Sequence, residues 1–186
     1  MGRAGCATLA ALIAVSCTAK TARQDIARPS AWRIAGVADV TADATQKAAA
    51  AAILAYFQDT ELGSRFAAGD DALCIGVGPA SGGPFRFQPL SDLDAALLQR
   101  IARTRPNARA VSECATTLKD APYRIEASGE PARLLACLDA GEAAPGAFTM
   151  LCGFYDSPVS AEFVGYDVSV AANEIIVRRN GKGLLF

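Results

Sequence analysis

The feature that most constrains the fold is a series of short β-prone segments in the second half of the chain. These segments are rich in valine, isoleucine and aromatic residues, and turn formers such as Gly-Glu, Asp-Ser-Pro and Asn-Gly separate them. Turns at such close spacing connect neighbouring antiparallel strands. The pattern therefore predicts an antiparallel meander, with strands at 123–127, 133–139, 148–155, 162–170 and 174–179.

The segment 162–170 indicates what the two faces of that sheet contact. From residue 163 onward one face carries Val164, Tyr166, Val168 and Val170, whereas the other mixes Phe163 with Gly165, Asp167 and Ser169. One apolar and one mixed face is typical of a sheet covered by helices on one side. Asn180-Gly181 favours a tight hairpin, which predicts a final strand at 184–186.

Two segments have the spacing of amphipathic helices. In 41–66 the apolar positions recur every four residues, with Thr41 or Asp43 as the expected cap and Gly63 as the expected end. Its run of five alanines would let the helix approach a sheet closely. In 91–104 Ser91 is the expected cap. The apolar stripes are Ala49, Ile53 and Phe57 in the first helix, and Leu93, Leu97 and Ile101 in the second.

These elements predict one α+β domain over residues 41–186. A further strand is expected at 71–78, before the second helix. We expect an antiparallel sheet of about five to six strands with two helices packed on one face. Cystatin-like and NTF2-like folds share this plan, and we use the likeness as an analogy of shape alone.

Four cysteines lie within the predicted domain, at Cys74, Cys114, Cys137 and Cys152. An even number in an exported chain indicates two disulfides, and three pairings are possible. None has the CxxC spacing of a zinc or thioredoxin-like site. Free buried thiols are the alternative.

Strand geometry favours one of the three pairings. If 134–141 and 147–155 form a hairpin that turns near Ala144–Pro145, Cys137 and Cys152 lie opposite each other. Cys74 is then left to pair with Cys114. The chain-entropy model gives about 3 kcal/mol of stabilisation for the shorter loop and about 4 kcal/mol for the longer one.

The first residues have the pattern of a secretory signal peptide. Arg3 precedes an uncharged, apolar run that ends in the small residues Ala14-Val15-Ser16, directly before Cys17. A membrane-spanning helix needs about 20 apolar residues, and this run is shorter and rich in alanine, threonine and serine. Residues 1–16 are therefore predicted to be a signal peptide.

The stretch Ala14-Val15-Ser16-Cys17 resembles the lipobox of bacterial lipoproteins. The resemblance implies that Cys17 becomes the first mature residue and carries a diacylglyceryl group and an amide-linked acyl chain. Two or more chains hold a protein stably on a bilayer. Thr18, where an Asp would favour the inner membrane, indicates the outer membrane. Residues 17–40 would then form a tether in which Trp32 docks on the domain.

The same signal-peptide pattern is also compatible with ordinary cleavage that leaves Cys17 without lipid. Ala14 and Ser16 fit the small-x-small rule for ordinary signal cleavage. That reading would give a soluble periplasmic or secreted protein in place of a lipid-anchored one.

Composition excludes several function classes. The formal net charge is −1, which disfavours a nucleic-acid partner, and the chain has no histidine. The usual zinc ligand and the usual general base are therefore missing. No residue set predicts a catalytic, cofactor or metal site. The acids considered as catalytic carboxylates are Asp70, Asp71, Glu113, Glu126, Asp156 and Asp167, and nothing in the sequence pairs any two.

Two further clusters have an ordinary and a functional interpretation. GVGPASGG (76–83) is a plain loop or a weak phosphate-loop pattern without the GK[ST] ending. Four arginines near the second helix either complement its dipole or contact anionic lipid headgroups or glycans. They are Arg100, Arg103, Arg105 and Arg109.

The sequence therefore predicts a cell-envelope lipoprotein with a small disulfide-stabilised binding domain. Its partners would be the bilayer, through acylated Cys17, and an envelope protein or cell-wall component. An envelope hydrolase that uses carboxylates alone is the alternative, and a cleft holding two acids would favour it.

Overall fold

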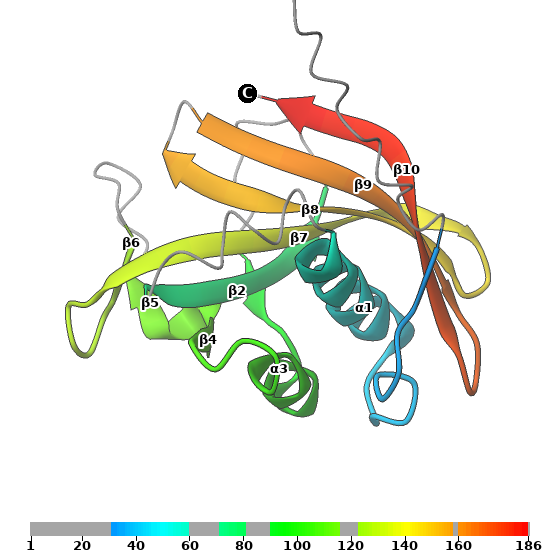
Figure 1. Ribbon diagram of the computed structural model, residues 1–186, viewed down its shortest axis with the longest axis horizontal. Coiled ribbons are helices and arrows are strands. Elements are labelled where there is room, and N and C mark those ends of the chain that lie inside the picture. Colours follow the sequence, from blue (N-terminus) through cyan, green and yellow to red (C-terminus); the bar gives the residue numbers. More distant parts are fainter. Residues whose placement is uncertain (1–30, 60–70, 81–89, 116–122, 158–159, 186) are drawn as a thin grey trace, which may run out of the picture.

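Within the residues that the structure describes, one ten-stranded, strongly twisted sheet dominates, and the helices α1 and α3 lie on one side of it (Figure 1). This computed structural model describes residues 31–59, 71–80, 90–115, 123–157 and 160–185. The helices in these ranges are α1 (Ala44–Gln58) and α3 (Ala95–Ala102), and a 3₁₀ turn, η1, spans Val111–Glu113. The strands are β1 (Trp32–Arg33), β2 (Ala72–Pro79), β3 (Ser91–Asp92), β4 (Ala108–Ala110), β5 (Cys114–Ala115), β6 (Tyr123–Ile125), β7 (Pro131–Ala144), β8 (Ala147–Ser157), β9 (Ser160–Val170) and β10 (Ile175–Leu185).

The α+β class and the antiparallel meander are confirmed, because β7, β8, β9 and β10 pair antiparallel in chain order. The expected number of five to six strands is wrong, since the sheet has ten. The additional strands β1, β3, β4 and β5 are only two or three residues long. Alternation of apolar and polar residues needs four or more residues to become visible, so the sequence does not reveal them.

The sheet is not purely antiparallel. Strand β2 pairs parallel with β7 along its whole length, from Ala72 opposite Ala132 to Pro79 opposite Asp139, and β4 is also parallel to β2. The chain between β2 and β7 contains α3 and the short strands, which is enough for a crossover connection. The sequence predicts β2 correctly as a strand but does not specify its direction in the sheet.

The expected hairpin at Asn180-Gly181 is a β-bulge instead. Strand β10 runs without a reversal to Leu185, and its register against β9 shifts between Arg179 and Gly183. Gly181 has a φ of 71°, which suits an irregular position that other residues adopt at a cost. The Asn180 amide donates to the Asp167 carboxylate at 2.9 Å, which holds the bulge on β9.

Helix α1 lies against the sheet through an unusually small-residue surface. Asp43 caps it by accepting from the Gln46 backbone N–H at 2.8 Å, which confirms one of the two expected caps. Ten consecutive residues, 48–57, are buried, and half of them are the alanine run 48–52. Because an alanine adds only a methyl group, the helix can pack closely against β8 and β9 of the sheet (Figure 1). The expected end at Gly63 lies outside the described residues.

Helix α3 begins later than expected. The side chain of Asp94, not of Ser91, accepts from the backbone N–H groups of Ala96 and Leu97. Ser91 belongs to β3, which pairs with β2. The stripe is confirmed, since Leu97 and Ile101 are fully buried.

Both favoured disulfides are present, on opposite faces of the sheet. Cys137 and Cys152 lie directly opposite each other on β7 and β8, with Cα atoms 4.0 Å apart, in the core beneath α1. Cys74 and Cys114 are joined with Cα atoms 6.4 Å apart, and they pack with Val111 on the other face. Each apolar cluster therefore contains one covalent link.

The folded body includes part of the predicted tether. Strand β1 pairs with β10, and Trp32, Ile34 and Val37 are buried in the main core. The Trp32 ring meets the edge of Tyr166 with centroids 6.1 Å apart, so the expected docking of Trp32 is confirmed. The packed region thus begins before residue 41. Cys17 lies outside the described residues, and within the described ranges no helix is long and apolar enough to cross a bilayer.

The β7–β8 turn yields a test of the fold. Gly146 has a φ of 75°, and a Cβ built on it would lie 2.7 Å from the carbonyl oxygen of Val170. Gly129, with a φ of 69°, has nothing within 4 Å of such a Cβ. We expect Gly129→Ala to cost about 1 kcal/mol through backbone strain alone, and Gly146→Ala to cost about 2–3 kcal/mol because the clash adds to that strain. Urea unfolding measures both, and equal losses would contradict the hairpin packing described here.

Candidate functional site

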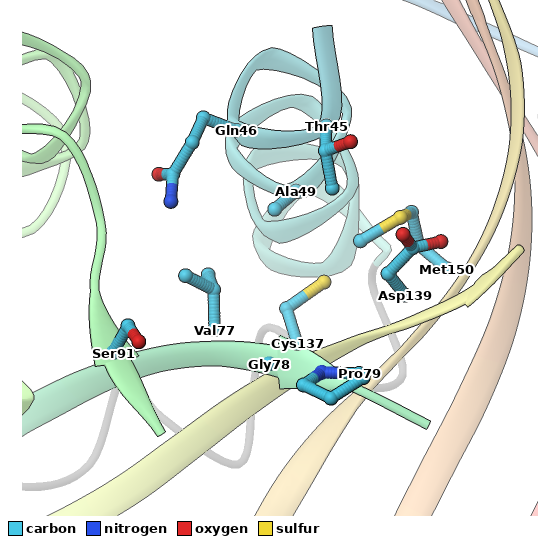
Figure 2. A pocket seen from close by; sticks show the side chains of 10 residues that line it. All are labelled: Thr45, Gln46, Ala49, Val77, Gly78, Pro79, Ser91, Cys137, Asp139 and Met150. Carbon is cyan, nitrogen blue, oxygen red and sulfur yellow. The ribbon is translucent and has the colours of Figure 1, made fainter. Parts of the chain in front are cut away.

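A cavity of about 270 Å³ opens between the amino-terminal turns of α1 and the sheet (Figure 2). It lies on the helix side of the sheet, where β2 ends and its parallel pairing with β7 stops, around Pro79 and Asp139. We call it the α1 cavity. Its described lining residues are Thr45, Gln46, Ala49, Val77, Gly78, Pro79, Ser91, Cys137, Asp139 and Met150.

The floor of the α1 cavity is apolar and its rim is polar. Ala49, Val77, Cys137 and Met150 are each no more than 7% exposed and form the floor. Figure 2 shows the polar side chains of Gln46, Ser91 and Asp139 around them. A small apolar pocket with a few fixed polar groups is the usual form of a ligand site.

Gln46 has a fixed amide orientation. Its Oε1 accepts the backbone N–H of Asp94 at 2.9 Å, which ties α1 to the start of α3. Because a backbone N–H can only donate, the atom that it meets must be the oxygen, and the amide nitrogen points elsewhere. In Figure 2 that nitrogen is directed toward the space above Val77. Gln46 therefore presents a donor to the cavity.

Asp139 is the one ionisable residue among the described residues that line the α1 cavity. One carboxylate oxygen, Oδ1, accepts from the Gly141 backbone N–H at 2.8 Å. The Asp139 carbonyl accepts from the Ala80 N–H at 2.7 Å, which fixes the backbone at this position. The cavity thus has a negative electrostatic character at one end.

A second cavity, of about 490 Å³, lies on the opposite face of the sheet beside the Cys74–Cys114 disulfide. Asp92 and Glu126 both line it, so the structure brings together two carboxylates that the sequence could not pair. Both oxygens of Asp92, however, accept from Ser112, from its backbone N–H at 2.8 Å and its hydroxyl at 2.6 Å. Asp92 therefore anchors η1 to β3.

The other acids considered from the sequence do not converge. Glu113 accepts from the backbone N–H of Ala110, and Asp71 is exposed at the start of β2. Asp167 accepts from Thr149 and Asn180 on the outer sheet face. Asp70 and the side chain of Asp156 lie outside the described residues. No sequence signal marked Asp92 or Asp139, because neither belongs to a local motif.

The arginine cluster makes contacts within its own chain. The Arg100 guanidinium donates to the Ala35 carbonyl, and that of Arg109 donates to the Pro106 and Ala108 carbonyls. Arg105 stacks over the Phe57 ring, 4.9 Å from its centroid. Arg103 is exposed at the helix end. These contacts favour the structural interpretation over an anion site.

A buried polar group lies at the other end of α1. Asp59 is 3% exposed and accepts from Arg179 of β10 at 2.9 Å. The nearby Tyr166 is fully buried, and among the described residues its hydroxyl has no hydrogen-bond partner. Burial, and secondly the charge of Asp59, raise the pKa of Tyr166 above its ordinary value of 10.0, whereas Arg179 lowers it.

No protein-family model, curated protein or solved structure matches this chain. The cystatin-like or NTF2-like plan therefore remains an analogy of shape, and the site must be interpreted from its own geometry.

The buried tyrosine predicts a loss of stability in alkaline solution. Above pH 10.0 an exposed tyrosine in the unfolded chain loses its proton, whereas Tyr166 keeps it in the folded state. The unfolded state then binds fewer protons, so the free energy of unfolding falls by up to about 1.4 kcal/mol per pH unit. Tyr166→Phe should remove this contribution to the fall of the free energy of unfolding with pH.

At neutral pH the Tyr166→Phe variant should be as stable as the wild type or more stable by about 1 kcal/mol, because it loses a buried hydroxyl that has no hydrogen-bond partner among the described residues. Urea unfolding of both proteins at pH 7 and above pH 10 measures this, and identical slopes would contradict it.

Proposed function

We propose that this chain is an exported lipoprotein of the bacterial cell envelope whose disulfide-stabilised domain binds a ligand or partner. The observation that carries the proposal is the combination of a lipobox-like sequence at Cys17 with a body held by two disulfides. Disulfides persist in oxidising compartments such as the periplasm. The α1 cavity, with an apolar floor and a polar rim, supports binding as the role of the domain.

The anchor and the covalent links can be tested together. Mass spectrometry of the unreduced protein from its native host should find an acylated Cys17 at the amino terminus and the links Cys74–Cys114 and Cys137–Cys152. Cys17→Ser should move the protein from the membrane fraction to the soluble periplasmic fraction, because the acyl chains supply the membrane affinity. An unmodified Cys17, or unchanged membrane fractionation of the variant, would contradict the proposed lipid anchor.

A hydrolase is the second candidate, and the cavity that contains Asp92 and Glu126 is the observation that favours it. Glycoside hydrolysis needs two carboxylates across one cleft, one of them free to exchange a proton. Because both oxygens of Asp92 accept from Ser112, we favour binding.

Purified peptidoglycan provides a direct comparison of the two candidates. If the domain only binds, the wild type and Glu126→Gln should release the same background of soluble reducing sugar. Release by the wild type that Glu126→Gln abolishes would replace the binding proposal with the hydrolase.

A further inference from the structure

We propose that the α1 cavity binds a small molecule with one positive charge, a compact apolar body and a hydrogen-bond acceptor at its far end. This inference rests on the proposal that the domain is a binding module, and it names the class of ligand. Three properties of the cavity lead to it: its charge, its fixed donor and its size.

The negative charge of the cavity lining favours a cationic ligand. Asp139 is the single ionisable group among the described lining residues, and no lysine or arginine is among them. Its Oδ1 is engaged by Gly141, and the described contacts place no cation on the carboxylate. A ligand ammonium group would neutralise Asp139 through a charge-assisted hydrogen bond.

An anionic ligand is disfavoured at the same place, although the amino terminus of a 15-residue helix lies beside the cavity. Helix amino termini attract anions through their free N–H groups. Here the Asp43 carboxylate already occupies the Gln46 N–H, and Asp139 adds a second negative charge nearby. Both carboxylates would repel a phosphate or carboxylate group.

Gln46 determines which kind of polar group the ligand should carry at its uncharged end. Its oxygen is committed to the Asp94 N–H, so the nitrogen that points into the cavity can only donate. The matching ligand atom is therefore an acceptor, such as an ether or carbonyl oxygen. Because the same amide holds the start of α3, its position is set before any ligand arrives.

Size limits the rest of the molecule. A cavity of about 270 Å³ holds on the order of nine water-sized groups, at about 30 Å³ for each water. The floor of Ala49, Val77 and Met150 is apolar and buried. A body of one ring or a short branched chain would fill it, and the Met150 sulfur suits an aromatic ring.

A matched set of three small compounds tests the expected charge and the expected acceptor of the ligand. The probe is 4-methoxyphenethylamine, which has an ammonium group, one ring and an ether oxygen. In 4-methoxyphenethyl alcohol the ammonium is replaced by a neutral hydroxyl, and in 4-ethylphenethylamine the ether oxygen is replaced by a methylene. Binding to the mature protein in detergent micelles is followed by NMR of the Ala49 and Gly78 amides, and by the dissociation constants obtained from their shifts.

We expect the probe to bind about tenfold more tightly than the alcohol, because a hydrogen bond to a charged group contributes about 1.5 kcal/mol or more. Asp139→Asn keeps an acceptor for Gly141 but removes the charge, and should abolish this preference. Asp167→Asn, an exposed acid on the other face of the sheet, is the matched control and should leave it intact.

Gln46→Glu tests the acceptor end, because it keeps an oxygen for the Asp94 N–H and removes the amide donor. It should abolish the preference of the protein for the methoxy probe over the ethyl probe. Equal binding of amine and alcohol by the wild type, absence of binding by the amine, or an Asp139→Asn variant that behaves like the wild type would each overturn the proposal. These outcomes are independent of Cys17 acylation, so failure of the anchor and failure of the ligand class can be told apart.

Discussion

The register of the β7–β8 hairpin is the constraint on which the rest of the structure depends. Pro145 and Gly146 make a two-residue turn between Ala144 and Ala147. The register shifts twice between Asp139 and that turn, and beyond the shifts Cys137 lies opposite Cys152, to which the disulfide joins it. Because side chains alternate between faces, a slip of one residue would turn Cys152 outward and Leu151 toward α1. Because the register shifts nearer the turn, the disulfide fixes which side chains of this hairpin face the helix, and β9 and β2 pair with its two strands.

Much of this arrangement could be predicted because it is encoded locally. The long strands of the meander are marked by β-prone residues between turn formers, with clear alternation in 162–170. The positions of Cys137 and Cys152 about an expected turn near Ala144–Pro145 predict their pairing, although the turn itself is one residue later, at Pro145–Gly146. The parallel pairing of β2 with β7 depends on residues sixty positions apart, such as Ala72 and Ala132, and has no local signature. Asn180-Gly181 is compatible with a hairpin and with a bulge, and pairing of Leu184 with Phe163 on β9 decides between them.

The candidate site was less predictable than the fold. The sequence directs attention to acids in local clusters, whereas the α1 cavity combines residues from five separate elements, α1, β2, β3, β7 and β8. Asp139 does not belong to a recognisable sequence motif. It is a candidate binding residue because β7 places it in the lining of the cavity beside the start of α1. The glycine-rich segment gave a partial signal, since Gly78 and Pro79 lie at the cavity edge. They contribute there as small lining residues, without the lysine and hydroxyl residue of a phosphate loop.

The cavity lies at the amino end of α1 because the two ends of the helix are filled differently. At the carboxyl end Tyr56 packs on Phe154 with ring centroids 5.7 Å apart, and Asp59 is joined to Arg179. At the amino end the α1 residues that line the cavity are Thr45, Gln46 and Ala49, and the buried one, Ala49, has only a methyl group (Figure 2). Large rings fill the space between helix and sheet at the carboxyl end of α1, whereas the short side chain of Ala49 leaves space unfilled at the amino end. The alanine run thus brings α1 close to the sheet and also leaves the opening in which Gln46 and Asp139 are exposed to a ligand.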